Sequence, residues 1–148
     1  MLNRRVLTTF LILSIGVSLV SCSEGKVSQC NQLIEIANQA ASNVESVTNN
    51  SSPDDPEAFL SIAETADEAA RSLEDVEITD STLEDYKQQF ISLYVETSLA
   101  TQQLVEAVQA QDAEEAEAAY GRLEEATEKE APLVDDVNAY CGGAAQNQ

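Results

Sequence analysis

The chain has 148 residues, of which 27 are acidic, 7 are basic and none is histidine, and its formal net charge is −20. This length is typical of one domain. Lys and Arg form no cluster that could replace the counterions of a nucleic acid, so we expect no nucleic-acid partner. Without histidine the chain offers no Ser-His or Cys-His couple and no zinc–histidine site. We therefore expect a protein that is not an enzyme and that holds no cofactor and no metal.

The first 22 residues have the pattern of an export signal. Arg4 and Arg5 precede an apolar run of 15 residues at 6–20. This run is too short to span a membrane comfortably and is typical of the apolar part of a signal peptide. The segment closes with the letters LVSC, in which the cysteine is Cys22. An ordinary signal peptide with an incidental Cys22 is one interpretation of this pattern.

The other interpretation starts from the LVSC sequence, which resembles the lipobox of bacterial lipoproteins. The resemblance implies that residues 1–21 are removed as a lipoprotein signal peptide. Cys22 would then become the N-terminus, linked to diacylglycerol and acylated, for example with palmitate. Two acyl chains anchor a protein stably to a lipid bilayer. The resemblance thus implies a lipid-anchored protein that faces the periplasm or a lumen, on the outer membrane or the extracytoplasmic face of the inner membrane.

The mature chain divides into a tether, a helical body and a tail. We expect a lipidated polar tether over 22–29, an acidic helical domain over 30–142 and a disordered tail over 143–148. Within the body, apolar side chains recur at steps of three and four residues, which indicates amphipathic helices. The pattern predicts four helices, over about 27–48, 55–76, 80–108 and 112–141.

Capping residues mark the beginnings of three of these helices. Asp55 is expected to cap the second helix, with Pro56 in its first position. The third helix should begin at Asp80 or Ser81, and Asp112 should cap the fourth. Short links between amphipathic helices favour an all-α fold, an antiparallel up-down-up-down four-helix bundle.

The fourth helix contains a helix breaker and is followed by two glycines. Pro132 lacks the backbone N–H that an interior position needs, so it should kink or split this helix. The apolar stripe resumes in phase after Pro132, which favours a kink. Gly142 and Gly143 are expected to end the helix, because glycine is common just past a helix C-terminus.

Two cysteines test this topology. Cys30 falls early in the first predicted helix and Cys141 falls at the end of the fourth, both on the apolar stripe. In an up-down-up-down bundle these two helix ends lie at the same pole. An extracytoplasmic location permits a disulfide there. We therefore predict a Cys30–Cys141 disulfide between the first and last helices; two buried free thiols are the alternative.

The third predicted helix carries a row of larger side chains. Tyr86, Phe90 and Tyr94 stand at helical spacing, and Thr97 and Thr101 fall near the same side. Such a row most often packs in the core, with tyrosine hydroxyls at the margin. The alternative is that these five residues line a small cavity between the helices.

Most acidic residues occur as neighbouring pairs, whose side chains diverge by about 100° on a helix. They are therefore expected to form a solvated face rather than a convergent pair for catalysis. Such carboxylates bind calcium or magnesium weakly, and no calcium-loop motif is present. Glu130 differs because it falls near the apolar stripe. A buried Glu130 with a raised pKa inside a pocket would favour catalysis.

These features predict a lipid-tethered accessory or interaction module without catalytic activity, whose acidic surface docks onto a basic protein partner or a membrane complex. The alternative is a bundle that binds a small ligand or a divalent cation. In architecture the mature chain resembles small four-helix bacterial lipoproteins of unassigned function. By lipobox, size and helix count it also resembles the extrinsic photosystem II subunit of cyanobacteria that is related to the plant oxygen-evolving Q protein.

Overall fold

A computed structural model describes residues 21–52 and 55–145, with side chains over 25–52 and 55–142. Residues 1–20 of the signal peptide expected over 1–21, the side chain of Cys22 and the end of the expected tail at 146–148 lie outside the described residues. All the regular structure within the described ranges is helical. The expected all-α fold with four helices is therefore confirmed.

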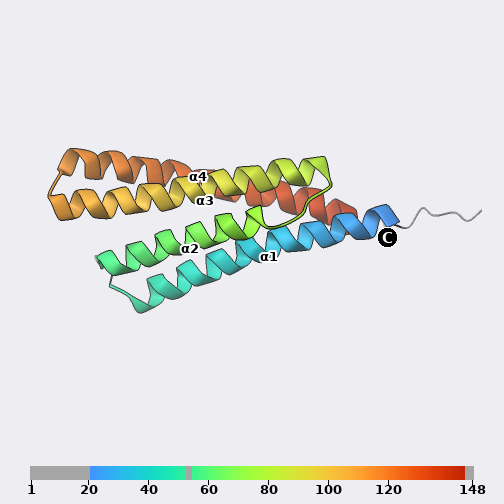
Figure 1. Cartoon of the computed structure of the whole chain (residues 1–148), viewed down its shortest axis with the longest axis horizontal. Coiled ribbons are helices and arrows are strands. Elements are labelled where there is room, and N and C mark those ends of the chain that lie inside the picture. The colour runs from blue at the N-terminus through green and yellow to red at the C-terminus, as the bar shows by residue number, and fades with distance from the viewer. Residues whose placement is uncertain (1–20, 53–54, 146–148) are drawn as a thin grey trace, which may run out of the picture.

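The chain forms four helices that pack along one another. They are α1 (Ser21–Asn50), α2 (Pro56–Glu74), α3 (Ser81–Ala110) and α4 (Ala113–Ala145). Figure 1 shows the α1–α2 link and the α3–α4 link at one end of the molecule and the α2–α3 link toward the other end. Helix α3 packs against both α2 and α4, whereas α2 and α4 do not contact each other. The α3–α4 hairpin extends beyond the α1–α2 link (Figure 1).

Three aspartates cap these helices. The Asp55 carboxylate accepts a hydrogen bond from the second amide of α2, with Pro56 in first position, as predicted. Asp80 accepts from the amides of Thr82 and Leu83 at the start of α3. Asp80 rather than Ser81 is therefore the cap of α3. At the start of α4, an Asp112 oxygen accepts from an amide 3.1 Å away, which satisfies a backbone donor that the helix itself leaves unpaired.

The structure corrects two predicted boundaries. Helix α1 begins at Ser21, so residues 22–29 belong to the helix rather than to a separate polar tether. Helix α4 runs through Pro132 without a break, so the helix is not split there. It also continues through Gly142 to Ala145, because no described glycine adopts the left-handed conformation that ends a helix.

The left-handed cap is found instead at the end of α3. Gln111 has φ 58° and ψ 30°, and its amide donates to the last carbonyls of α3. The amide of Asp112 also donates back to the Ala107 carbonyl, at 2.9 Å. These bonds close α3 and turn the chain into α4 within two residues, although glutamine adopts this conformation less readily than glycine.

Large core side chains gather toward one end of the fold. The fully buried set includes Leu33, Leu73, Leu83 and Phe90, and it surrounds the two cysteines. Toward the opposite end the buried positions are mostly small, with alanines on α2, α3 and α4. The core is therefore thick beside the cysteines and thin beyond them, so unfilled space between the helices is expected in the thin part.

Candidate functional site

A cavity of about 370 Å³ lies between the four helices. Helix α1 contributes Ala40 and Val44, and α2 contributes Phe59 and Ile62. Helix α3 forms part of the wall with Tyr94 and two threonines, and α4 adds a leucine, a threonine and a glutamate. The lining is mainly apolar with a few polar groups, which is the usual composition of a small-molecule site.

The cavity follows from the way the helices pack. Helix α1 packs much less closely along α3 and α4 than α3 packs along α2 and α4, so the space beside α1 is not closed by close helix–helix contact. The residues that face this space from α1 and α2 include Ala40, Ala41 and Ala66. Alanine side chains are too small to fill it. The same alanine-rich stripes that let the helices approach closely thus leave a hollow between them.

Tyr94 is the most unusual polar group of the cavity lining. Its side chain is 5% exposed, and its hydroxyl has no hydrogen-bond partner among the described residues. Burial, together with the nearby Glu130 charge, raises the pKa of Tyr94. The hydroxyl therefore stays protonated at neutral pH. A buried hydroxyl without a partner costs about 1–3 kcal/mol.

Glu130 is the carboxylate of this cavity. It is half-buried, and burial raises the pKa of its carboxyl group. It also lines a neighbouring hollow of about 170 Å³, so it stands between two unfilled spaces. Neither space is lined by a Lys or Arg side chain. Glu130 is therefore the charged hydrogen-bond acceptor of a largely apolar lining.

The threonines of the lining contribute less polarity than their number suggests. The Thr101 hydroxyl donates to the Thr97 carbonyl at 2.7 Å. Thr65 and Thr127 likewise donate to carbonyl groups of their own helices. These hydroxyl hydrogens are used within the helices, so the threonines present methyl groups and acceptor oxygens to the cavity.

The five residues considered as cavity lining do not all reach this cavity. Tyr94, Thr97 and Thr101 line it. Phe90 stacks on Tyr94 with ring centroids 6.0 Å apart and lies in the core beside the smaller hollow. Tyr86 packs edge-on against another tyrosine near the cysteines, with centroids 5.9 Å apart. The first two residues of the row therefore pack in the core, and the last three line the cavity.

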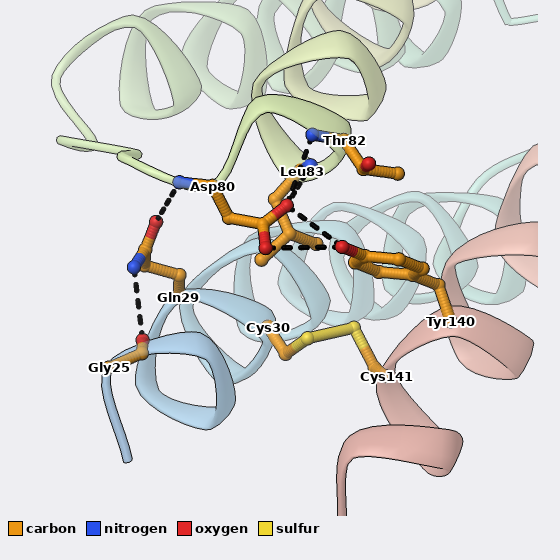
Figure 2. Close-up of a disulfide and its surroundings, with 8 residues drawn as sticks. All are labelled: Gly25, Gln29, Cys30, Asp80, Thr82, Leu83, Tyr140 and Cys141. Atoms are coloured by element: carbon orange, nitrogen blue, oxygen red, sulfur yellow. Dashed lines mark hydrogen bonds between the residues drawn. A yellow bond between two sulfur atoms is a disulfide. The ribbon is translucent and has the colours of Figure 1, made fainter. Parts of the chain in front are cut away.

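The predicted cysteine pair lies at the end of the fold with the thick core. The sulfur atoms of Cys30 and Cys141 are at disulfide distance, and their Cα atoms are 5.8 Å apart. Figure 2 shows this disulfide joining α1 to α4, beneath the residues that begin α3. Both cysteines are buried, at 2% and 8% exposed. The first and last helices are thus linked at the pole where the topology expected them to meet.

Asp80 connects this pole to α3 and α4. Its carboxylate accepts from two α3 amides and also from the Tyr140 hydroxyl, whose oxygen lies 3.0 and 3.1 Å from the two carboxylate oxygens (Figure 2). Desolvation on burial raises the pKa of Asp80, but the hydrogen bonds from Leu83, Tyr140 and Thr82 outweigh it, and the net pKa is lowered. The charged form of Asp80 is therefore stabilised.

Gln29 ties α1 to the same place. Its side-chain oxygen accepts from the amides of Thr79, at 2.6 Å, and Asp80, at 3.1 Å. Its side-chain nitrogen donates to the Gly25 carbonyl at 3.1 Å (Figure 2). Lys26 of α1 also contacts α4 at this pole, where its ammonium lies 3.4 Å from the centre of the Tyr140 ring. The pattern of apolar residues gave no signal for these polar contacts.

A larger hollow of about 750 Å³ lies along the outside of α3 and α4. It is lined mostly by exposed polar side chains such as Gln88, Glu125 and Lys129, so we regard it as a surface groove rather than a binding cavity. Among the described residues, no three His, Cys, Asp or Glu side chains are grouped to hold a metal ion. In the same residues, no helix combines the length and apolar character needed to cross a bilayer.

Comparison of this chain with known protein families, with curated proteins and with solved structures finds no match.

Proposed function

We propose that this protein is a membrane-anchored, extracytoplasmic binding protein that holds a small, largely apolar molecule between its helices. The observation that carries this proposal is the cavity of about 370 Å³, whose mainly apolar lining comes from all four helices. The volume lies in the range of small-molecule sites. The proposal favours the binding alternative over the accessory role.

The fold in this proposal is the antiparallel up-down-up-down bundle closed by the Cys30–Cys141 disulfide. The positions of the links in Figure 1 support this topology. The short Cα–Cα separation of the cysteines supports it as well. Such a bundle commonly builds ligand sites from side chains on facing helices, and the disulfide would hold the first and last helices together at the pole away from the cavity.

The anchor in this proposal is the lipidated Cys22, which supports placement on an extracytoplasmic membrane face. Labelling of growing bacteria with a palmitate analogue tests it, because only an acylated protein takes up the label. We expect the natural protein to be labelled and Cys22→Ala to be unlabelled. The matched control replaces both Cys30 and Cys141 by alanine and should retain the label. Labelling of Cys22→Ala would contradict the anchor.

Ligand binding is tested with 1-adamantanol, a rigid apolar cage that carries one hydroxyl group. The purified protein is placed in zwitterionic lipid nanodiscs, and the amide resonances of Thr97 and Thr101 are followed during titration. Ala41→Phe places a large ring at the cavity edge, because Ala41 lines the cavity and is exposed. Ser42→Phe is the matched control, since Ser42 is also exposed but lies outside the lining.

We expect saturable shifts in the natural protein and in Ser42→Phe, and their loss in Ala41→Phe. Equal shifts in all three proteins would place the probe outside the cavity. An absence of shifts in all three would overturn the proposed site, because a preformed apolar cavity of this size should accept a rigid apolar probe.

A second candidate is the accessory module that docks onto a basic protein or membrane complex. The supporting observation is that Leu99 and Val108 on α3 and Tyr120 on α4 are 53%, 56% and 58% exposed on the projecting hairpin of a chain with charge −20. Retrieval of the protein from its own membranes, with and without a high-salt wash, tests this role. A salt-sensitive complex that is lost in Leu99→Lys and retained in Ala41→Phe would favour docking over ligand binding.

A further inference from the structure

The carboxylate of Glu130 faces the cavity without a basic partner. The described chain holds five basic side chains, and all of them are engaged elsewhere. They are Lys26 on the Tyr140 ring, Arg71 with Asp67, Lys87 with Glu84, Arg122 with Glu115, and Lys129 with Glu96 and Glu125. None of the five lines the cavity or the smaller hollow beside it. The only formal charge in the wall of either space is therefore negative.

We infer that the cavity selects ligands that carry an ammonium group, with Glu130 as the anionic contact and the apolar wall around the rest of the molecule. This inference rests on the proposed ligand-binding function and names the chemical class of its ligand. An organic cation would supply the opposite charge that a partly buried carboxylate lacks, and charge-assisted hydrogen bonds are the stronger ones.

The aromatic groups of the wall suit the same ligand class. Phe59 from α2 and Tyr94 from α3 both line the cavity, and ring faces attract organic cations. The hydroxyl hydrogens of Thr65 and Thr101 are bonded to backbone carbonyls, so these oxygens remain only as hydrogen-bond acceptors, which suits a cationic ligand. Burial raises the pKa of Glu130, so its charged form is poorly stabilised by the protein alone and gains from a bound cation.

An anionic ligand of the same shape is expected to bind poorly in this cavity. Its charge would lie beside Glu130 with no Lys or Arg of the lining to offset it. The chain as a whole carries a net charge of −20, which also disfavours the approach of anions. A neutral alcohol stands between these cases, because Glu130 can accept a hydrogen bond from it without a charge partner.

Three probes of one shape separate these cases: 1-adamantylamine, 1-adamantanol and 1-adamantanecarboxylate. Each is titrated into the full protein in zwitterionic nanodiscs at pH 7, and dissociation constants are read from the amide shifts of Thr97 and Thr101. Empty nanodiscs give the correction for partition into lipid. We expect the amine to bind about tenfold more tightly than the alcohol, as a charge-assisted contact allows, and the carboxylate to bind most weakly.

Two variants assign the preference to Glu130. In Glu130→Gln we expect the amine to lose its advantage over the alcohol, while the alcohol binds as before. Glu128→Gln is the matched control, because it removes one charge from an exposed position of α4 that is outside the cavity lining. It should keep the tenfold preference. An equal loss in both variants would overturn the inference, because the preference would then come from the net charge alone.

The outcomes separate this inference from the proposal beneath it. If the alcohol and the amine bind equally well in the natural protein, the inference is wrong and the proposed binding function stands. If the carboxylate binds best, the inference is likewise wrong. If none of the three probes shifts the cavity amides, both the inference and the proposed function are overturned.

Discussion

Removing the Cys30–Cys141 disulfide should destabilise the fold by several kcal/mol. The two cysteines are separated by 111 positions in the sequence, so the bond closes nearly the whole described chain into one loop. In the chain-entropy view a loop of this length contributes about 5 kcal/mol. Alanine at both positions is expected to lower the free energy of unfolding by about 3–5 kcal/mol. This is a large share of a typical domain's total stability of about 5–15 kcal/mol.

Urea unfolding followed by circular dichroism measures this change. The double variant Cys30→Ala/Cys141→Ala is compared with the natural protein under oxidising and reducing conditions. The reduced natural protein should unfold close to the double variant, because both lack the bond. A loss below about 1 kcal/mol, or a natural protein that does not respond to reductant, would refute the reasoning. Either result would mean that the helix ends stay together without the covalent link.

Four further substitutions probe single features of the fold, each by urea unfolding. Gln111→Gly should stabilise the protein by about 0.5–1 kcal/mol, because glycine adopts the left-handed cap conformation without strain; a loss of stability would contradict this. Tyr94→Phe should add about 1 kcal/mol by removing an unpaired buried hydroxyl, whereas Tyr140→Phe, which loses the bond to Asp80, should destabilise; a destabilised Tyr94→Phe would show that its hydroxyl is satisfied. The lowered pKa of Asp80 means that its contribution is present above its unfolded-state pKa and is lost as the pH falls through its folded-state pKa. Below neutral pH, the free energy of unfolding should therefore fall less steeply with decreasing pH in Asp80→Asn than in the natural protein. Identical pH dependence in the two proteins would contradict the lowered pKa.

The helical periodicity of the sequence predicted the fold because each stripe specifies which face of a helix is buried. The order of the helices and the positions of Cys30 and Cys141 within them were enough to place these two residues together. The helix ends were predicted less accurately. Gly142 remains helical where a cap was expected, and Gln111 adopts the left-handed conformation that glycine favours. Backbone preferences are weak terms that packing can override.

The cavity was harder to predict because a stripe shows which residues face inward and not how far apart the facing surfaces lie. Tyr94, Thr97 and Thr101 could be chosen as candidates, but Phe59 on α2 could not be distinguished from an ordinary core residue. Glu130 gave a usable signal, because a charged residue near an apolar stripe is uncommon. The contacts of Gln29 with Thr79 and Asp80 span about 50 residues, and polar contacts over such separations leave no periodic pattern.

The placement of the covalent link has a mechanical consequence for the cavity. The disulfide and the thick core fix the helix pairs α1–α2 and α3–α4 at one pole, while toward the other end the α1–α2 and α3–α4 links join helices only within each pair (Figure 1). Helix α3 packs along α2 as well as along α4, so the two pairs are not separate bodies, and the end far from Cys30 differs mainly in having small buried side chains. Regions with few large buried contacts open at the lowest free energy. Local opening is therefore expected to begin at the end far from Cys30, while the covalent link keeps the pole closed.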